Sequence, residues 1–198
     1  MKRRTIDRIV SLLGLGLSVF LFVLAGLLYW GYNFANDEVT NQLAAQKISF
    51  PAADSDSFKN LADEDRVAIE PFAGLALTTG EQAKAYADHY IGAHVKGIAG
   101  GKTYSEVSGE ALAVSAQSRA NPGDAELAAK AATLMGQRQS LFMGETLKGL
   151  LGYAYAFWQI GQIAMYAMWA ALAGGVIMLI LSILGFMHLR RTPDSVTV

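Results

Sequence analysis

Two long stretches of the chain carry no Asp, Glu, Lys or Arg, and they dominate its pattern of polar and apolar positions. The first covers residues 9–32 and consists mainly of Leu, Val, Ile, Phe, Gly and Ser. A helix of that length is about 36 Å long, enough to cross a hydrocarbon core of about 30 Å. The second runs from 149 to 189, and we assign 158–189 to the membrane. The pattern therefore predicts two transmembrane helices.

Charged and aromatic side chains flank these stretches asymmetrically. Basic residues lie at the outer ends, before the first stretch and after the second: Lys2, Arg3, Arg4, Arg8, Arg190 and Arg191. Aromatic residues lie at the inner ends: Tyr29, Trp30, Tyr32, Tyr153, Tyr155, Phe157 and Trp158. Basic residues favour the cytoplasmic side, and aromatic rings favour the membrane interface. We therefore predict a plasma-membrane protein with cytoplasmic ends (1–8 and 190–198) and an extracytoplasmic domain over 33–157.

A cleaved signal peptide is the competing interpretation of the first stretch. Such a peptide has an apolar region of about 7–15 residues and ends in an A-x-A-like site. Here the apolar region is longer, and it continues into Asn-Phe-Ala-Asn at 33–36, which matches that site poorly. The chain has no cysteine, which excludes a lipoprotein anchor. We therefore expect an uncleaved membrane anchor.

The first helix is predicted to continue through 33–47, because apolar residues still recur there at helical spacing. Phe50 precedes a proline and should end it, since that position disfavours the α conformation. An Ala-, Ser- and Asp-rich linker is expected over 51–60, a helical turn from 63–65 and a loop at 71–74.

Two capping boxes predict further helices: Thr78 with Glu81, and Thr103 with Glu106. The helix that begins after Thr78 should end at Gly100-Gly101. A turn at 121–124 then leads to a helix over 125–135, a soft break at 137–140 and a helical pattern that enters the second apolar stretch. No stretch alternates with period two, so we predict an all-α fold, with two transmembrane helices flanking a helical domain.

Composition narrows the function classes further. The chain is 53% hydrophobic and 17% charged, below the roughly 25% charge of soluble domains. Residues 9–188 hold 10 basic and 15 acidic side chains, a net charge of −5, which argues against nucleic-acid binding. Without cysteine there is no disulfide, thiolate zinc site or cysteine nucleophile.

Candidate chemistry is sparse. On an α-helix, His89 and His94 lie about 140° apart and do not face one metal. The stretch 97–103 ends in Gly-Lys-Thr, but Lys96 replaces the first glycine of a phosphate loop and the preceding element is a helix. We therefore predict no catalytic, cofactor-binding or metal-binding residue, no cofactor and no enzymatic activity.

The membrane stretches contain pairs of small residues one helical turn apart. These are Gly14 with Ser18, Ala170 with Gly174, and Ala171 with Gly175. Small residues allow close helix packing in lipid. The contact can be with a partner or between the two helices of this chain, and both alternatives stay open. Gln159 and Gln162 could hydrogen-bond a partner or a lipid head group.

Four segments carry a resemblance to a known family: 41–51, 79–89, 100–104 and 144–151. They resemble a family of actinobacterial two-span membrane proteins of uncharacterised function. Some members are labelled aromatic ring-opening dioxygenases, but an extradiol dioxygenase needs two histidines and a carboxylate at iron, which this sequence does not offer. The chain is also similar to small accessory subunits of the actinobacterial cytochrome bcc–aa3 supercomplex.

The first hypothesis is a non-enzymatic accessory or assembly subunit of a membrane complex, specifically that respiratory supercomplex. Its partners would be membrane lipids and other integral membrane subunits, including cytochrome bcc and aa3 oxidase subunits. The alternative is an extracytoplasmic protein that binds lipid or an envelope precursor in a groove lined by the apolar faces of 83–98 and 107–114. An enzyme would need a metal at His89 and His94.

Overall fold

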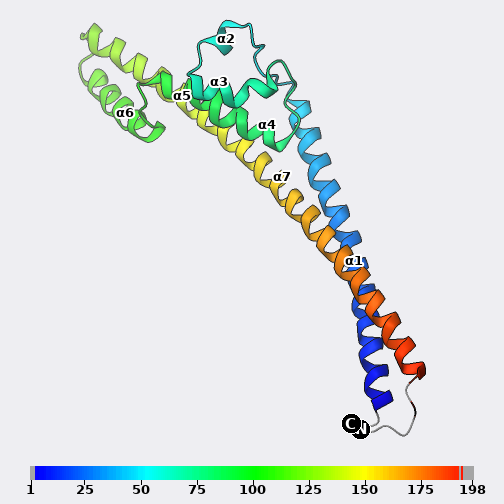
Figure 1. The fold of residues 1–198 in the computed structure, drawn as a ribbon. Helices are drawn as coiled ribbons and strands as arrows, with labels where there is room; N and C mark the ends of the chain where they lie inside the picture. Colours follow the sequence, from blue (N-terminus) through cyan, green and yellow to red (C-terminus); the bar gives the residue numbers. More distant parts are fainter. Residues whose placement is uncertain (1–2, 192, 194–198) are drawn as a thin grey trace. The chain divides into compact units, whose positions relative to one another are not determined.

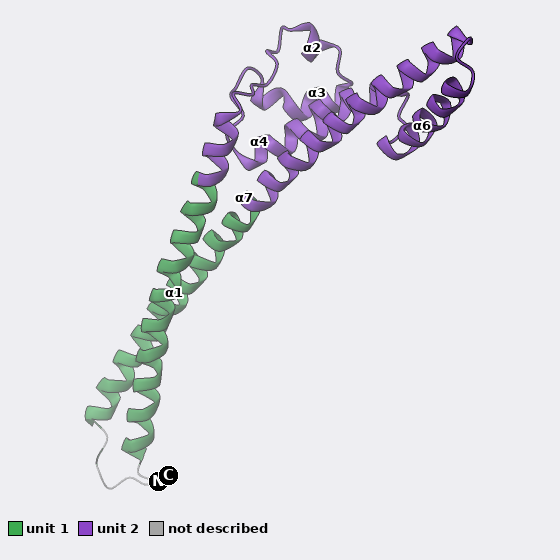
Figure 2. Ribbon diagram, turned by 180° about the vertical axis from the view of Figure 1, so that it is seen from behind, with its two compact units in different colours: residues 1–37, 159–198 green, residues 38–158 purple. Residues whose placement is uncertain are grey.

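The computed structural model describes residues 3–191 and Pro193, and helices make up most of this part of the chain (Figure 1). In chain order the elements are α1 (Arg3–Ala45), α2 (Asp56–Lys59), α3 (Asp63–Ile69), the 3₁₀ turn η1 (Glu70–Phe72), α4 (Gly80–Ala85), the π-helix η2 (Tyr86–Ile91), α5 (Gly92–Ile98), α6 (Tyr104–Ala120) and α7 (Ala125–Arg191). The predicted all-α class is confirmed. The chain divides into unit 1, residues 1–37 and 159–198, and unit 2, residues 38–158 (Figure 2).

Both α1 and α7 are long and apolar enough to cross a membrane. In each helix only 17% of the most apolar window is buried, whereas the central helix of a soluble protein is mostly buried. Large apolar side chains such as Leu13, Val23, Ile163 and Ile177 are exposed instead. This exposure is typical of helices whose solvent is lipid. The cytoplasmic position of the ends and the extracytoplasmic position of the middle stay predictions.

Unit 1 packs α1 against α7 through small residues. The Ser18 hydroxyl donates a hydrogen bond to the carbonyl oxygen of Gly175 at 2.8 Å. A Cβ atom built on Gly175 would lie 3.1 Å from the Phe22 ring, and one built on Gly14 would lie 2.6 Å from Oγ of Ser182. The two backbones therefore approach closely where the small residues lie, as expected for helices that associate in lipid.

Unit 2 has two apolar clusters that hold its helices on α7. The larger one draws buried side chains from the end of α1, the segments between α1 and α4, α4 itself, η2 and α7: Val39, Leu43, Phe50, Phe58, Leu61, Ile69, Leu77, Ala83, Tyr86, Ala87 and Leu151. The smaller one joins Val95 of α5, Val107 of α6 and Leu141 of α7. Arg138 of α7 adds a hydrogen bond from Nε to the Ser108 hydroxyl at 2.9 Å.

Several sequence predictions for unit 2 are confirmed. α1 continues to Ala45, α3 begins at Asp63, and Thr103 with Glu106 forms the capping box of α6. The segment after α5 ends the helix as expected, because Gly100 and Gly101 both adopt positive φ.

One β-type contact between two loop segments of unit 2 was not predicted from the sequence. Ser49 and Ala76 form an isolated antiparallel bridge. The amide of Phe50 donates to the carbonyl of Leu75, and that of Leu77 donates to the carbonyl of Ile48, both at 2.9 Å. The bridge joins single residues of two loops, which is too short for alternation in the sequence, so only the pairing in space reveals it.

Three predictions for unit 2 need correction. The expected linker over 51–60 contains α2, and its Phe58 is buried in the larger cluster. The capping box of α4 is Thr79 with Gln82, because two overlapping pairs satisfy the same sequence rule and the chain uses the second. No break interrupts α7 at 137–140, where the Gln137 amide instead donates to the carbonyl of Ile98 at 3.1 Å.

Candidate functional site

The two histidines considered for a metal face different partners in unit 2. Nδ1 of His89 and Oδ1 of Asp65 are 2.9 Å apart, and Asp65 is only 7% exposed. Nδ1 of His94 lies 2.7 Å from the carbonyl oxygen of Tyr90. Over residues 3–191, no three histidine or carboxylate side chains are grouped as a metal would require. The angle expected on an α-helix does not apply, because His89 belongs to the π-helix η2, whose bonds join residues five apart.

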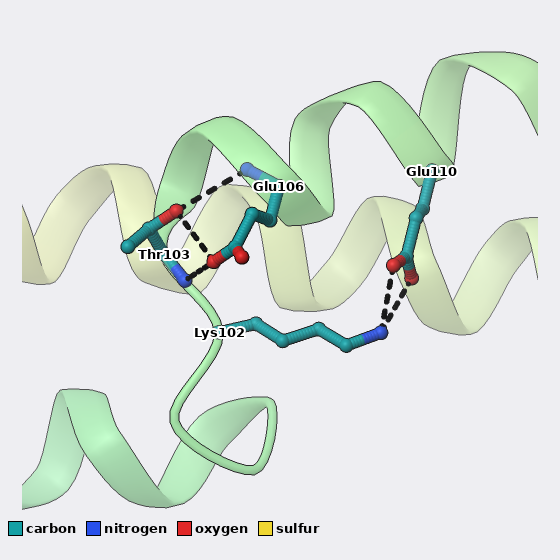
Figure 3. A network of polar contacts seen from close by, with 4 residues as sticks. All are labelled: Lys102, Thr103, Glu106 and Glu110. Atoms are coloured by element: carbon teal, nitrogen blue, oxygen red, sulfur yellow. Dashed lines mark hydrogen bonds and ion pairs between the residues drawn. The ribbon is translucent and has the colours of Figure 1, made fainter.

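The Gly-Lys-Thr segment serves the start of α6 (Figure 3). The Glu106 carboxylate accepts hydrogen bonds from the Thr103 amide at 2.7 Å and the Thr103 hydroxyl at 2.8 Å. These bonds hold the pKa of Glu106 below its usual value. Lys102 forms an ion pair with Glu110 at 2.7 Å. Lys102 and Thr103, the two polar residues of the Gly-Lys-Thr segment, are therefore both engaged in structural contacts.

The small-residue pairs of the membrane stretches are used in different ways. Gly14, Ser18, Ala171 and Gly175 lie in the contact between α1 and α7. These four residues therefore pack the two helices of this chain against each other. Ala170 is exposed.

One of the two glutamines near the end of unit 1 also has a partner within the chain. Nε2 of Gln162 donates to Oδ1 of Asn36 at 3.3 Å, across the contact between α7 and α1. The side-chain amide of Asn36 in turn donates to the carbonyl of Tyr32 at 2.8 Å. This amide pair satisfies polar groups at the place where the sequence suggested a bond to a lipid or a partner.

The four aromatic residues predicted as an interfacial belt on α7 divide into two pairs. Trp158 packs on Gly80 and on the larger apolar cluster of unit 2. Tyr155 receives the Lys84 ammonium over its ring, 5.2 Å from the centroid. Tyr153 and Phe157 are exposed. Trp158 and Tyr155 therefore contact the α4 segment, and the position of all four rings at a membrane interface stays a prediction.

The exposed pair belongs to a longer apolar surface, which we call the α7 face and define as Phe142, Met143, Leu150, Tyr153 and Phe157. All five side chains are between 40% and 77% exposed. With about 200 Å² for a fully exposed large side chain, the surface measures on the order of 500 Å². The largest apolar patch on a typical monomer is about 300–600 Å² and is often functional. The α7 face is therefore the main candidate for a binding surface in unit 2.

The α7 face follows from the register of the helix. Residues 143, 150 and 157 are seven apart, which keeps them on one side of an α-helix. The opposite side of the same helix, including Leu141, Leu147 and Leu151, packs into the two clusters of unit 2. The seven-residue spacing was visible in the sequence, but α7 is apolar on both sides, so periodicity alone did not separate the buried side from the exposed one.

The residues expected to line a lipid-binding groove are packed instead. Val95 of α5 and Val107 of α6 pack against Leu141 of α7, and Val107 and Leu141 are fully buried. Ala111 of α6 is also buried. Buried residues of 83–98 and 107–114 thus supply contacts that hold these helices on α7, whereas Leu112 of α6 is exposed.

Comparison with known proteins adds no assignment, because no family model, no curated protein and no solved structure matches this chain.

Proposed function

We propose that this chain is a non-enzymatic accessory or assembly subunit of a membrane protein complex. It would lie in the plasma membrane with both termini cytoplasmic and residues 33–157 outside. The observation that carries the proposal is the α7 face, an exposed apolar surface on the part of the chain predicted to lie outside the bilayer. The resemblance of the chain to accessory subunits favours the respiratory cytochrome bcc–aa3 supercomplex as the complex in this proposal.

The length of the uncharged part of α7 supports this proposal. Residues 149–189 would form about 60 Å of helix, whereas the hydrocarbon core is about 30 Å thick. One bilayer crossing therefore leaves roughly half of that length uncovered. Since apolar side chains exposed to water favour association, the α7 face is suited to contact another protein.

The residues of unit 1 also support a non-enzymatic role. Its small residues are used to pair α1 with α7. The predicted membrane segments 9–32 and 158–189 contain no Asp, Glu, Lys or Arg. Such residues, where they occur within a membrane segment, mark conduction pathways and proton relays. Anchoring the outer part of the chain is the role that such a helix pair fills.

The test is an affinity purification of the full chain from native membranes in a mild detergent. Co-purifying proteins are identified by mass spectrometry, and haem is measured by absorbance. We expect cytochrome subunits and haem in fixed ratio to the chain. Recovery of the chain alone as a monodisperse species would overturn the proposal. Recovery with bound lipid only would favour the lipid-binding alternative.

A matched pair of variants connects this result to the α7 face. Leu150→Asp places a charge in the face, where Leu150 is 61% exposed, and should abolish co-purification. Leu112→Asp alters a leucine of α6 that is 53% exposed and lies outside the face, and should leave co-purification intact. Equal helix content of both variants by circular dichroism separates lost binding from lost folding. Equal recovery of partners with both variants would contradict a role for the face.

A further inference from the structure

A pocket of about 360 Å³ opens in unit 2 between residues 60–65 and α5. Its polar lining comes from Asn60, Glu64, Asp65, His94 and Lys96, and the remainder is apolar. Small-molecule sites begin at about 300 Å³ and combine an apolar surface with a few polar groups. The pocket therefore has room for a molecule of a few tens of atoms at most.

Two opposite charges in this lining have no partner in the described part of the chain. The side chains of Glu64 and Lys96 are exposed and form neither an ion pair nor a hydrogen bond there, with each other or with a third residue. The carboxylate of Asp65, in contrast, is held by His89. The pocket thus presents one unpaired carboxylate and one unpaired ammonium.

His94 adds an acceptor to the same lining. The carbonyl oxygen of Tyr90 can only accept a hydrogen bond, so Nδ1 of His94 donates to it and carries the ring proton. In the neutral ring, Nε2 is then an acceptor. Together with the Glu64 carboxylate and the Asn60 side-chain oxygen, it provides up to three acceptors, which matches the three N–H groups of a primary ammonium.

The segment before α5 gives independent support for a site here. Residues 86–91 form the π-helix η2, a rare conformation that is frequently found at functional sites. The ring centroids of Tyr86 and Tyr90 are 4.8 Å apart, and those of Tyr90 and His94 are 4.6 Å apart. This row of rings connects Tyr86, which is buried in the larger apolar cluster, with His94, which lines the pocket.

We propose that the pocket binds a small zwitterion, in which a short carbon spacer joins a primary ammonium to an anionic group. The ammonium contacts Glu64, His94 and Asn60, and the anionic group contacts Lys96. The side chains of Leu61 and Ala93 pack on the spacer. Two sources share this chemistry, the phosphoethanolamine head group of a phospholipid and a free α-amino acid. The inference is independent of the proposed accessory role.

The experiment uses the full chain in a nonionic detergent, with binding followed by saturation-transfer difference NMR. Four probes separate the contributions. Glycerophosphoethanolamine and alanine are zwitterions with a primary ammonium, glycerophosphocholine has a quaternary ammonium without N–H groups, and glycerophosphoglycerol has only the anionic group. We expect binding of one or both primary-ammonium zwitterions and at least tenfold weaker binding of the other two. Binding of the first alone assigns the head group, and binding of alanine alone assigns a free solute.

Charge-removing variants test the assigned contacts. Glu64→Gln and Lys96→Gln should each weaken binding about tenfold, the usual effect of losing one charge-assisted contact. Glu126→Gln and Lys130→Gln, two exposed residues of α7 outside the pocket, should leave it unchanged. Binding of none of the probes, or equal binding by all four variants and the unaltered chain, would overturn the proposal.

Discussion

The Ser18 hydroxyl donates to the carbonyl oxygen of Gly175 at 2.8 Å, and so joins two helices across 157 positions of sequence. Ser18 is almost fully buried in this contact. The bond is possible because glycine lets the facing backbone come close enough for a short side chain to reach it. We expect Ser18→Ala to lower the stability of the helix pair by about 0.6 kcal/mol, the average for such bonds in membranes.

A larger loss is expected from Gly175→Leu. The new Cβ would lie 3.1 Å from the Phe22 ring, so the helices must separate or the ring must move. Overpacking of this kind costs about 1–3 kcal/mol. Gly16→Leu is the matched control, because no atom lies within 4 Å of a Cβ at that position. Thermal unfolding in detergent, followed by circular dichroism, measures both, and equal midpoints would contradict the packing described here.

Gly80 is the corresponding close contact in unit 2. A Cβ on Gly80 would overlap the Cβ and Cγ atoms of Trp158, which are held by the larger apolar cluster. We expect Gly80→Ala to lower the free energy of unfolding by about 1–3 kcal/mol. Gly97→Ala, in α5 and with open space around the new atom, should instead be neutral or stabilise by up to about 1 kcal/mol. Denaturant unfolding in detergent distinguishes the two directions.

Asp65 joins α3 to the π-helix η2 through His89. We expect Asp65→Asn to destabilise unit 2 by about 1–2 kcal/mol, since it weakens a hydrogen bond made by a nearly buried carboxylate. Asp63→Asn is the control, because the Asp63 side chain is 90% exposed and its ion pair with Arg66 should contribute little. Hydrogen exchange of the 86–91 amides, measured by mass spectrometry, should rise in the first variant and not in the second.

Alkaline pH should destabilise unit 2 through Tyr86. Burial in the larger cluster raises the pKa of Tyr86 from 10.0 to about 12. In the unfolded chain the phenol loses its proton near its ordinary pKa, whereas in the folded chain it stays protonated. The contribution of Tyr86 is therefore fully present below pH 10 and is lost as the pH rises from 10 to 12.

Unfolding followed as a function of pH checks this direction. The Tyr86→Phe variant should lose stability less steeply than the unaltered chain above pH 10, because it has no phenol to ionise there. Tyr153→Phe should follow the unaltered chain, since Tyr153 is 77% exposed. Parallel curves for all three proteins would show that Tyr86 does not remain protonated in the folded state.

The helices themselves were largely predictable from local signals. The apolar stretches, the capping box at Thr103 and the glycines at 100–101 each act through neighbours a few residues away, and α1 and α6 appear where these signals place them. The prediction was weaker where two local signals compete. Thr78 and Thr79 both have a suitable residue three positions later, and the structure uses Thr79.

The candidate sites were far less accessible to this reasoning. The pocket combines residues 60–65, expected in part to be a linker, with His94 and Lys96 of α5. Nothing in either segment indicates the other. The π-helix between Tyr86 and Ile91 also changes the phase of the residues around it, so angles calculated for an α-helix do not apply.

By itself, the sequence determined the helical class, the two stretches apolar enough for a membrane and the absence of cysteine chemistry. These features depend on composition and on spacing within one helix. The tertiary structure alone decided that Ser18 meets Gly175, that Trp158 covers Gly80 and that the α7 face stays exposed. The physical reason is that α7 is apolar on several sides, so which side is buried depends on the segments that pack against it, and those contacts join residues far apart in the chain.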